Sequence, residues 1–204
     1  MKTRHLLPAL LFLASAIPSR AALIYSGVQN VAIPQTLDGV YVRLSDGFVT
    51  GTYPGDPGWA AGAWLNPFFG GVDVGNNPLL RPIITGTDQI VNLSLGTVID
   101  SGSNFVAGES GSSTHTGAAA NQFHPGTPGL IGFAFETTVG GPDHYGWLRM
   151  TVNNAGVGNI TDWAIDDTAG VAVLAGVSSV PEPATVLVGV ALCGVSVLRR
   201  RRRL

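Results

Sequence analysis

Three successive runs of alternating residues in the second half of the chain set the strongest limit on how it can fold. The runs cover 130–136, 144–152 and 159–166, and turn-forming stretches at 140–143 and 153–158 separate them. Large apolar side chains recur at every second position, which is the period of a β-strand, whereas a helix would space them by three or four. Consecutive strands joined by short turns predict an antiparallel meander.

The composition extends this prediction to the whole segment 22–177. The chain contains 28 glycines and 13 prolines, which disfavour long helices and favour turns. Short β-prone runs also occur before position 50, and 171–177 forms a last one. The expected fold is therefore all-β, an antiparallel β-sandwich that is jelly-roll-like or related.

Strict alternation also assigns faces to two of these strands. One face of 144–152 is expected to carry Tyr145, Trp147, Arg149 and Thr151, opposite Leu148 and Met150. One face of 159–166 is expected to carry Ile160, Asp162, Ala164 and Asp166, opposite Trp163 and Ile165. Dense aromatic residues between 50 and 82, Trp59 and Trp64 among them, predict a loop-rich segment that folds back over the sheet.

The charge of the segment 22–179 differs strongly from that of the whole chain. Its basic residues are Arg43, Arg81 and Arg149, against twelve acidic residues, which gives a formal charge of −9. Such a surface does not bind nucleic acid by bulk electrostatics. The single cysteine, Cys193, lies outside this segment, so no disulfide is expected within it.

The N-terminal segment 1–21 has the features of a secretory signal peptide with its apolar helix. Lys2 and Arg4 precede an apolar stretch at 6–17. Ser19 and Ala21 supply the small residues that favour cleavage before Ala22. Export of the segment 22–177 is therefore expected.

The C-terminal segment 178–204 has three parts in a fixed order. A rigid tripeptide at 181–183 precedes an uncharged, mostly apolar run at 184–198, and five arginines follow at 199–203. The 15-residue run would span roughly 22 Å as a helix, which is short for a bilayer core of about 30 Å. A buried helix is the alternative, but five adjacent charges could not follow it into a core. A single transmembrane helix is therefore expected.

The arginines then predict the topology of that helix. Positive charge stays on the cytoplasmic side, so the segment before 184 is expected outside. The residues of this topology signal are Arg199, Arg200, Arg201, Arg202 and Arg203.

These three parts together resemble the PEP-CTERM sorting signal of Gram-negative bacteria. The resemblance implies that an integral-membrane transpeptidase, the exosortase, recognises the tripeptide Pro181, Glu182 and Pro183. It also implies processing near this motif, followed by release or attachment at the cell surface. The runs 131–135, 144–147 and 162–165 resemble those of other ectodomains in this family, for which the resemblance implies no catalytic residues.

No catalytic or metal-binding motif is present in the sequence. Asp162 and Asp166 would lie about 13 Å apart along one strand, too far for a pair of glycosidase carboxylates by themselves. His115 and His124 have no further ligands at a diagnostic spacing. We therefore expect no enzyme activity, no cofactor and no metal site.

Aromatic residues are the remaining candidates for ligand binding. Tyr145, Trp147 and Trp163 are candidates for stacking on sugar rings, if their faces are exposed. The alternative, which the need for bulk in a domain of many small residues favours, is that they pack in the core. A carbohydrate-binding module needs exposed aromatic rings on one sheet face, so burial of both Trp147 and Trp163 would exclude that function.

Three hypotheses follow for the function. The first is a non-enzymatic surface or extracellular-matrix protein that an exosortase sorts, passing from an inner-membrane precursor to the cell surface or medium. Its partners would be the exosortase, the secretion machinery and the membrane. The second is a carbohydrate-binding module that holds exopolysaccharide. The third, a secreted hydrolase, is the least favoured.

Overall fold

The computed structural model describes residues 23–36, 38–68, 71–73, 79–84, 90–106, 123–153 and 157–178. They belong to one compact unit, Ala21–Ser179. The predicted signal peptide, the sorting motif 181–183, the apolar span and the terminal arginines lie outside the described residues, as does His115. Within the described residues, no helix is long and apolar enough to cross a membrane.

The described chain is all-β, and every pair of strands in it is antiparallel. A six-stranded sheet is formed by β1 (Leu23–Tyr25), β2 (Val31–Ile33), β7 (Leu80–Pro82), β9 (Gly129–Phe135), β10 (His144–Val152) and β11 (Gly158–Asp166). A four-stranded sheet is formed by β3 (Tyr41–Arg43), β4 (Phe48–Thr50), β5 (Trp64–Phe68) and β6 (Gly71–Asp73). The two remaining strands, β8 (Val98–Ile99) and β12 (Val173–Leu174), pair with each other. The helix α1 (Asp56–Ala60) lies between β4 and β5 in the sequence.

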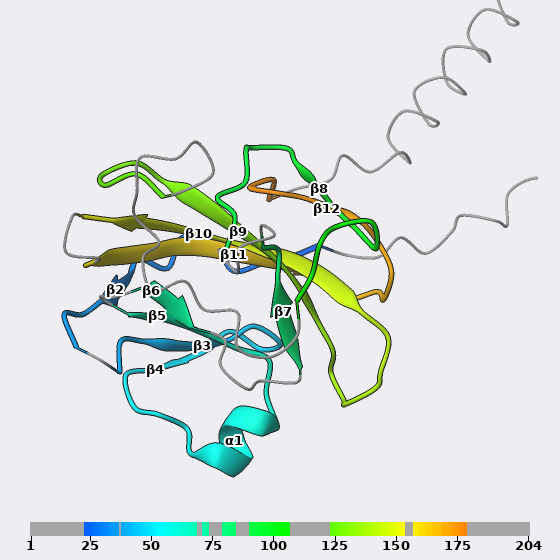
Figure 1. Cartoon of the computed structure of the whole chain (residues 1–204), viewed down its shortest axis with the longest axis horizontal. Helices are drawn as coiled ribbons and strands as arrows, with labels where there is room; N and C mark the ends of the chain where they lie inside the picture. The colour runs from blue at the N-terminus through cyan, green and yellow to red at the C-terminus, as the bar shows by residue number, and fades with distance from the viewer. Residues whose placement is uncertain are drawn as a thin grey trace, which may run out of the picture. The chain divides into compact units, whose positions relative to one another are not determined.

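The predicted meander is confirmed in the centre of the six-stranded sheet. The sheet order is β1–β11–β10–β9–β7, so the three longest strands are neighbours both in sequence and in space (Figure 1). The alternation of β10 is also confirmed, because Leu148 and Met150 belong to one buried cluster and Tyr145 and Trp147 to another. The period of two therefore predicted both the strand and its two faces.

The face assigned to Ile160 is wrong, because β11 contains a β-bulge. Arg149 pairs with Asp162 but the next residue, Met150, pairs with Ile160, which leaves Thr161 as an extra residue. A bulge reverses the alternation on one side of the extra residue. Ile160 consequently packs in the same cluster as Trp163, on the face opposite Asp162.

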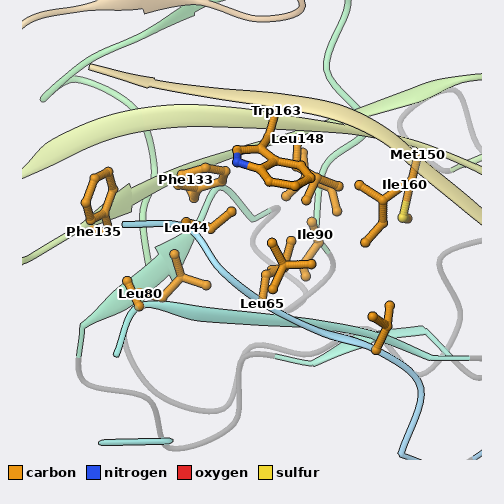
Figure 2. Close-up of a cluster of buried hydrophobic side chains, with 14 of the residues drawn as sticks. Leu44, Leu65, Leu80, Ile90, Phe133, Phe135, Leu148, Met150, Ile160 and Trp163 are labelled. Carbon is orange, nitrogen blue, oxygen red and sulfur yellow. The ribbon is translucent and has the colours of Figure 1, made fainter. Parts of the chain in front are cut away.

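The two sheets lie in two layers that share one hydrophobic core, the inner core (Figure 1). The four-stranded sheet and its turns contribute Leu44 and Leu65, and the six-stranded sheet contributes Phe133, Leu148 and Trp163, which point toward them in Figure 2. All five side chains are at most 5% exposed. This shared core fixes β11 against the turn between β3 and β4.

A second cluster, the outer core, covers the other face of the six-stranded sheet. Trp147 and Ala164 of that sheet pack there against Ile99 and Val173, from the two-stranded pair, with Phe105 at the margin. The six-stranded sheet is therefore buried on both faces.

The predicted folding back of the aromatic segment is confirmed on the four-stranded sheet. Trp59 of α1 lies edge-on to Tyr41 of β3, with ring centroids 5.8 Å apart, and both pack with Trp64. The rings of Phe48 and Tyr53 remain 52% and 43% exposed at the rim of this cluster. This face thus has a thin aromatic cover.

Candidate functional site

The aromatic residues predicted to stack on sugars are buried. Trp147 is 0% exposed, Tyr145 2% and Trp163 5%. A ring can stack on a sugar only through an open face, so the prediction of a stacking site at these three residues is wrong. The rings serve as core instead, as the alternative interpretation stated.

Protein contacts already occupy the rings of Tyr145 and Trp147 in the outer core. The indole N–H of Trp147 donates to the carbonyl of Val177 at 3.2 Å. The Arg149 guanidinium lies 5.2 Å from the Trp147 ring centroid, and Phe105 stacks on Tyr145 at 5.6 Å. These contacts bind the meander to the segments that cover it.

Asp162 forms a buried polar cluster with Tyr25 and Arg149 on the outer face of the six-stranded sheet. The Tyr25 hydroxyl donates to Asp162 Oδ2 at 2.8 Å, and Arg149 Nη1 lies 3.4 Å from the same oxygen. The hydrogen bond to Asp162 is the main reason why the pKa of Tyr25 is raised, with desolvation second. Asp162 Oδ1 has no hydrogen-bond partner in the described part of the chain. The cluster therefore joins β1, β10 and β11.

Asp166 does not converge with Asp162 on a shared site. Its Oδ1 accepts the backbone N–H of Thr168 at 2.9 Å, so it stabilises the turn that follows β11. Burial raises the pKa of the Asp166 carboxyl, and that hydrogen bond offsets part of the effect. The two carboxylates lie in separate local networks, so they do not form a pair of catalytic acids.

Asp143, at the turn before β10, also makes a contact that stabilises the fold. The Arg81 guanidinium contacts the Asp143 carboxylate and lies 3.4 Å from Glu136. The next residue, His144, stacks on Phe135 with ring centroids 5.2 Å apart. This network joins β7 to the hairpin between β9 and β10.

Metal ligands do not cluster in the part of the chain that the structure describes. No three His, Cys, Asp or Glu side chains there are placed to hold one ion. His124 is exposed in a turn.

A pocket of about 220 Å³ opens where the β3–β4 turn meets β11, and it is the strongest candidate for a binding site. We call it the Trp163 pocket. Its walls are residues from 24–29, the turn 44–47, and Trp163 and Ile165 of β11. A Cβ placed on Gly47 would lie 3.2 Å from Trp163 Cζ2 and 3.8 Å from its Nε1, so the turn faces the nitrogen edge of the indole.

Polar groups at the mouth of the Trp163 pocket are held by the fold. Arg43 binds Asp46 through two hydrogen bonds, of 2.8 Å and 2.5 Å, and these lower the pKa of the Asp46 carboxyl. The guanidinium also lies 5.2 Å from the ring centroids of Phe48 and Trp64. On the other wall, Ser26 Oγ accepts the backbone N–H of Trp163 at 2.9 Å.

Sequence reasoning missed the Trp163 pocket as a site, although it singled out Trp163. Trp163 and Ile165 lie more than a hundred residues after the other two wall segments in the sequence, and no local motif joins them. The one available signal was the Asp46-Gly47 turn after an alternating strand, which places a glycine where a ring can approach.

Comparisons with known proteins give no relative. No protein-family model matches this chain, and neither a curated protein nor a solved structure is significantly similar to it. The functional interpretation therefore depends on the order of parts at the C-terminus and on the geometry described above.

Proposed function

We propose that this protein is an exported, non-enzymatic surface or extracellular-matrix protein, and that an exosortase sorts it through its PEP-CTERM-like tail. One observation carries the proposal: the tripeptide 181–183, the uncharged run 184–198 and the arginines 199–203 follow one another in that order. In the sequence, the motif follows directly after the compact unit Ala21–Ser179. Prolines at 181 and 183 favour an extended backbone, the shape that a protease cleft accepts.

The proposal includes a location and a set of partners. The precursor is held in the inner membrane with its arginines on the cytoplasmic side, and the processed form reaches the cell surface or the medium. Its partners are the secretion machinery, the membrane and the exosortase. Nucleic acid is not a partner, because the segment 22–179 has a formal charge of −9.

The finer fold assignment, a jelly-roll-like or related β-sandwich, belongs to the same proposal. Successive strands lie side by side within each sheet, as β9, β10 and β11 do in one and β5 and β6 in the other. A jelly roll alternates its strands between sheets through Greek-key connections. The order observed supports a related sandwich.

A non-enzymatic ectodomain is supported by what its acidic residues contact. Asp162 pairs with Tyr25 and Arg149, and Asp143 contacts Arg81. These contacts tie strands together, which is a structural use of charge. We keep a secreted hydrolase as the least favoured alternative. The carbohydrate-binding module expected from exposed rings is withdrawn, because Trp147 and Trp163 are both buried.

Intact mass spectrometry of the protein from its own host tests the proposal. Membrane and medium fractions are expected to contain a species that begins near Ala22 and ends near 181–183, without the arginines. A membrane species that still carries Arg199–Arg203 would mean that the tail is only an anchor.

Two variants separate recognition of the motif from membrane insertion. Glu182→Gln removes the only charge between Asp167 and Arg199 and is expected to leave the tail uncleaved. As the matched control, replacing the five arginines by lysines keeps the positive charge, so insertion and cleavage are expected to continue. A triple variant that carries Glu182→Gln, Pro181→Ala and Pro183→Ala has lost the whole motif. Normal cleavage of this triple variant would contradict recognition of the motif.

A further inference from the structure

We propose that the Trp163 pocket binds one ring of a neutral carbohydrate, with the nitrogen edge of the indole donating a hydrogen bond to a sugar hydroxyl. This inference goes beyond the proposed function, since it concerns the folded domain and holds whether or not the tail is processed. It also differs from the excluded stacking site, because it uses the edge of one ring rather than an exposed face.

The first argument is that the Trp163 pocket contains hydrogen-bonding groups with no protein partner. The indole N–H of Trp163 and the hydroxyl of Ser45 have no hydrogen-bond partner among the described residues. By contrast, the indole N–H of Trp64 donates to the carbonyl of Gly58 at 3.0 Å, and that of Trp147 to Val177. Trp163 Nε1 is not among the buried atoms that lack a partner, so this N–H is accessible in the Trp163 pocket and can donate to a ligand oxygen in place of water.

The second argument is the mixed character of the walls. Ile24 is half exposed at the rim, and Leu44 and Ile165 provide apolar surface. The polar residues of the walls, Ser45, Asp46 and Gln29, offer both donors and acceptors. A sugar ring has apolar C–H faces and a periphery of hydroxyls, so it matches walls that are apolar on one part and hydrogen-bonding on another.

The third argument is charge. Among the described residues that line the pocket, Asp46 is the only ionisable one, and Arg43 pairs with it at 2.5 Å. The pair is neutral as a whole, so the pocket has no uncompensated charge to attract an anion or a cation. Asp46 Oδ1 already accepts from Arg43 and from the backbone N–H of Phe48, whereas Oδ2 accepts from Arg43 and keeps a lone pair for a sugar hydroxyl.

The size of the Trp163 pocket sets the number of rings. Its volume of about 220 Å³ lies below the range of roughly 300–1,000 Å³ that is typical for drug-sized ligands. One ring therefore fits, either as a chain end or as a branch. With so few atoms in contact, we expect a dissociation constant on the order of 1 mM.

A titration of indole N–H signals tests this inference. The full-length chain, labelled with ¹⁵N in its tryptophan indoles, is kept in dodecylphosphocholine micelles, because detergents with sugar headgroups would compete. The probes are the methyl glycosides of glucose, galactose, mannose and N-acetylglucosamine, with glucuronate as the charged comparison. At least one neutral glycoside is expected to shift the Trp163 signal, while the signals of Trp64 and Trp147 stay in place. Trp163→Phe assigns the signal by removing it.

A matched pair of variants links the shift to the Trp163 pocket. Ser45→Phe places a ring in the mouth of the pocket and is expected to weaken binding at least tenfold. Ser101→Phe places the same ring in another exposed turn and is expected to leave binding unchanged. Three results would overturn the inference: no shift with any neutral glycoside, equal shifts of Trp59 and Trp163, or full binding by Ser45→Phe.

Discussion

The two sheets of this domain bury their residues in different ways. In the six-stranded sheet, β10 and β11 are nine residues long and have the inner core on one face and the outer core on the other. In the four-stranded sheet the strands are three to five residues long. Only one face of that sheet meets the inner core, and α1 with its neighbouring aromatic residues covers the other thinly.

This difference explains why an aromatic residue on an alternating strand is a poor sign of a binding face. An antiparallel sheet commonly has one face in water, which would expose every second residue. Here the segments 90–106 and 171–177 close over that second face, so Trp147 is as buried as the inner core. The half-exposed rings, Phe48 and Tyr53, lie on the sheet with the shorter strands.

The largest effect is expected from removing a ring of the outer core. Trp147→Ala deletes a side chain that is 0% exposed, together with its hydrogen bond to Val177. We expect a loss of about 3–5 kcal/mol in the free energy of unfolding, measured by urea denaturation followed by circular dichroism. Phe48→Ala, on the outer face of the other sheet, should cost roughly 1 kcal/mol or less, since half of the ring is already in water. Equal losses would mean that the two outer faces are equivalent after all.

Local pattern was sufficient for the meander and for the faces of β10. It was not sufficient for β11, where Ile160, Thr161 and Asp162 give no sign that Thr161 is an extra residue. The bulge follows from pairing, since Ile160 must reach the inner core while Asp162 must reach Arg149 on the other face. Such a requirement exists only once the neighbouring strand is in place.

The candidate site could be predicted even less, because it depends on packing between the two sheets. The turn 44–47 meets Trp163 only through the shared core, across more than a hundred residues of sequence. Residue types alone favoured core packing for Trp163 but could not exclude stacking.

An intermediate effect is expected from adding one methyl group to a glycine. A Cβ on Gly146 of β10 would lie 2.6 Å from Phe133 Cε2 and 2.7 Å from the carbonyl oxygen of Ala164. Neighbouring strands hold both atoms, so we expect Gly146→Ala to cost about 1–3 kcal/mol in thermal or urea unfolding. At Gly51, just after β4, a Cβ would meet nothing within 4 Å. Gly51→Ala is therefore expected to be neutral or to stabilise by up to about 1 kcal/mol. A tolerated alanine at position 146 would show that the central strands can separate more than their packing implies.

The smallest effects are expected at two aspartates, one beside each sheet, whose pKa values shift in opposite directions. Burial raises the pKa of Asp166 at the end of β11, whereas the Arg43 hydrogen bonds lower that of Asp46 in the turn after β3. A raised pKa favours the folded state below the unfolded pKa, and this advantage is lost as pH rises through the folded pKa. A lowered pKa favours the folded state above the unfolded pKa, and this advantage is lost as pH falls through the folded pKa.

The two asparagine variants are therefore expected to change stability in opposite directions at neutral pH. Asp166→Asn keeps an oxygen that accepts the Thr168 N–H and removes the desolvated charge. Its free energy of unfolding, measured by urea denaturation, should therefore rise by less than about 1 kcal/mol. Asp46→Asn breaks a half-exposed ion pair, so its free energy of unfolding should fall by no more than about 0.5 kcal/mol. The Asp166→Asn difference should vanish below the ordinary aspartate pKa of about 3.9, where the carboxyl is protonated in both states. The Asp46→Asn difference should shrink from that pH downward and vanish only below the lowered folded pKa of Asp46. If Asp166→Asn instead lowers the midpoint at neutral pH, then the Asp166 charge is stabilised at the sheet end and the depth of burial does not govern its pKa.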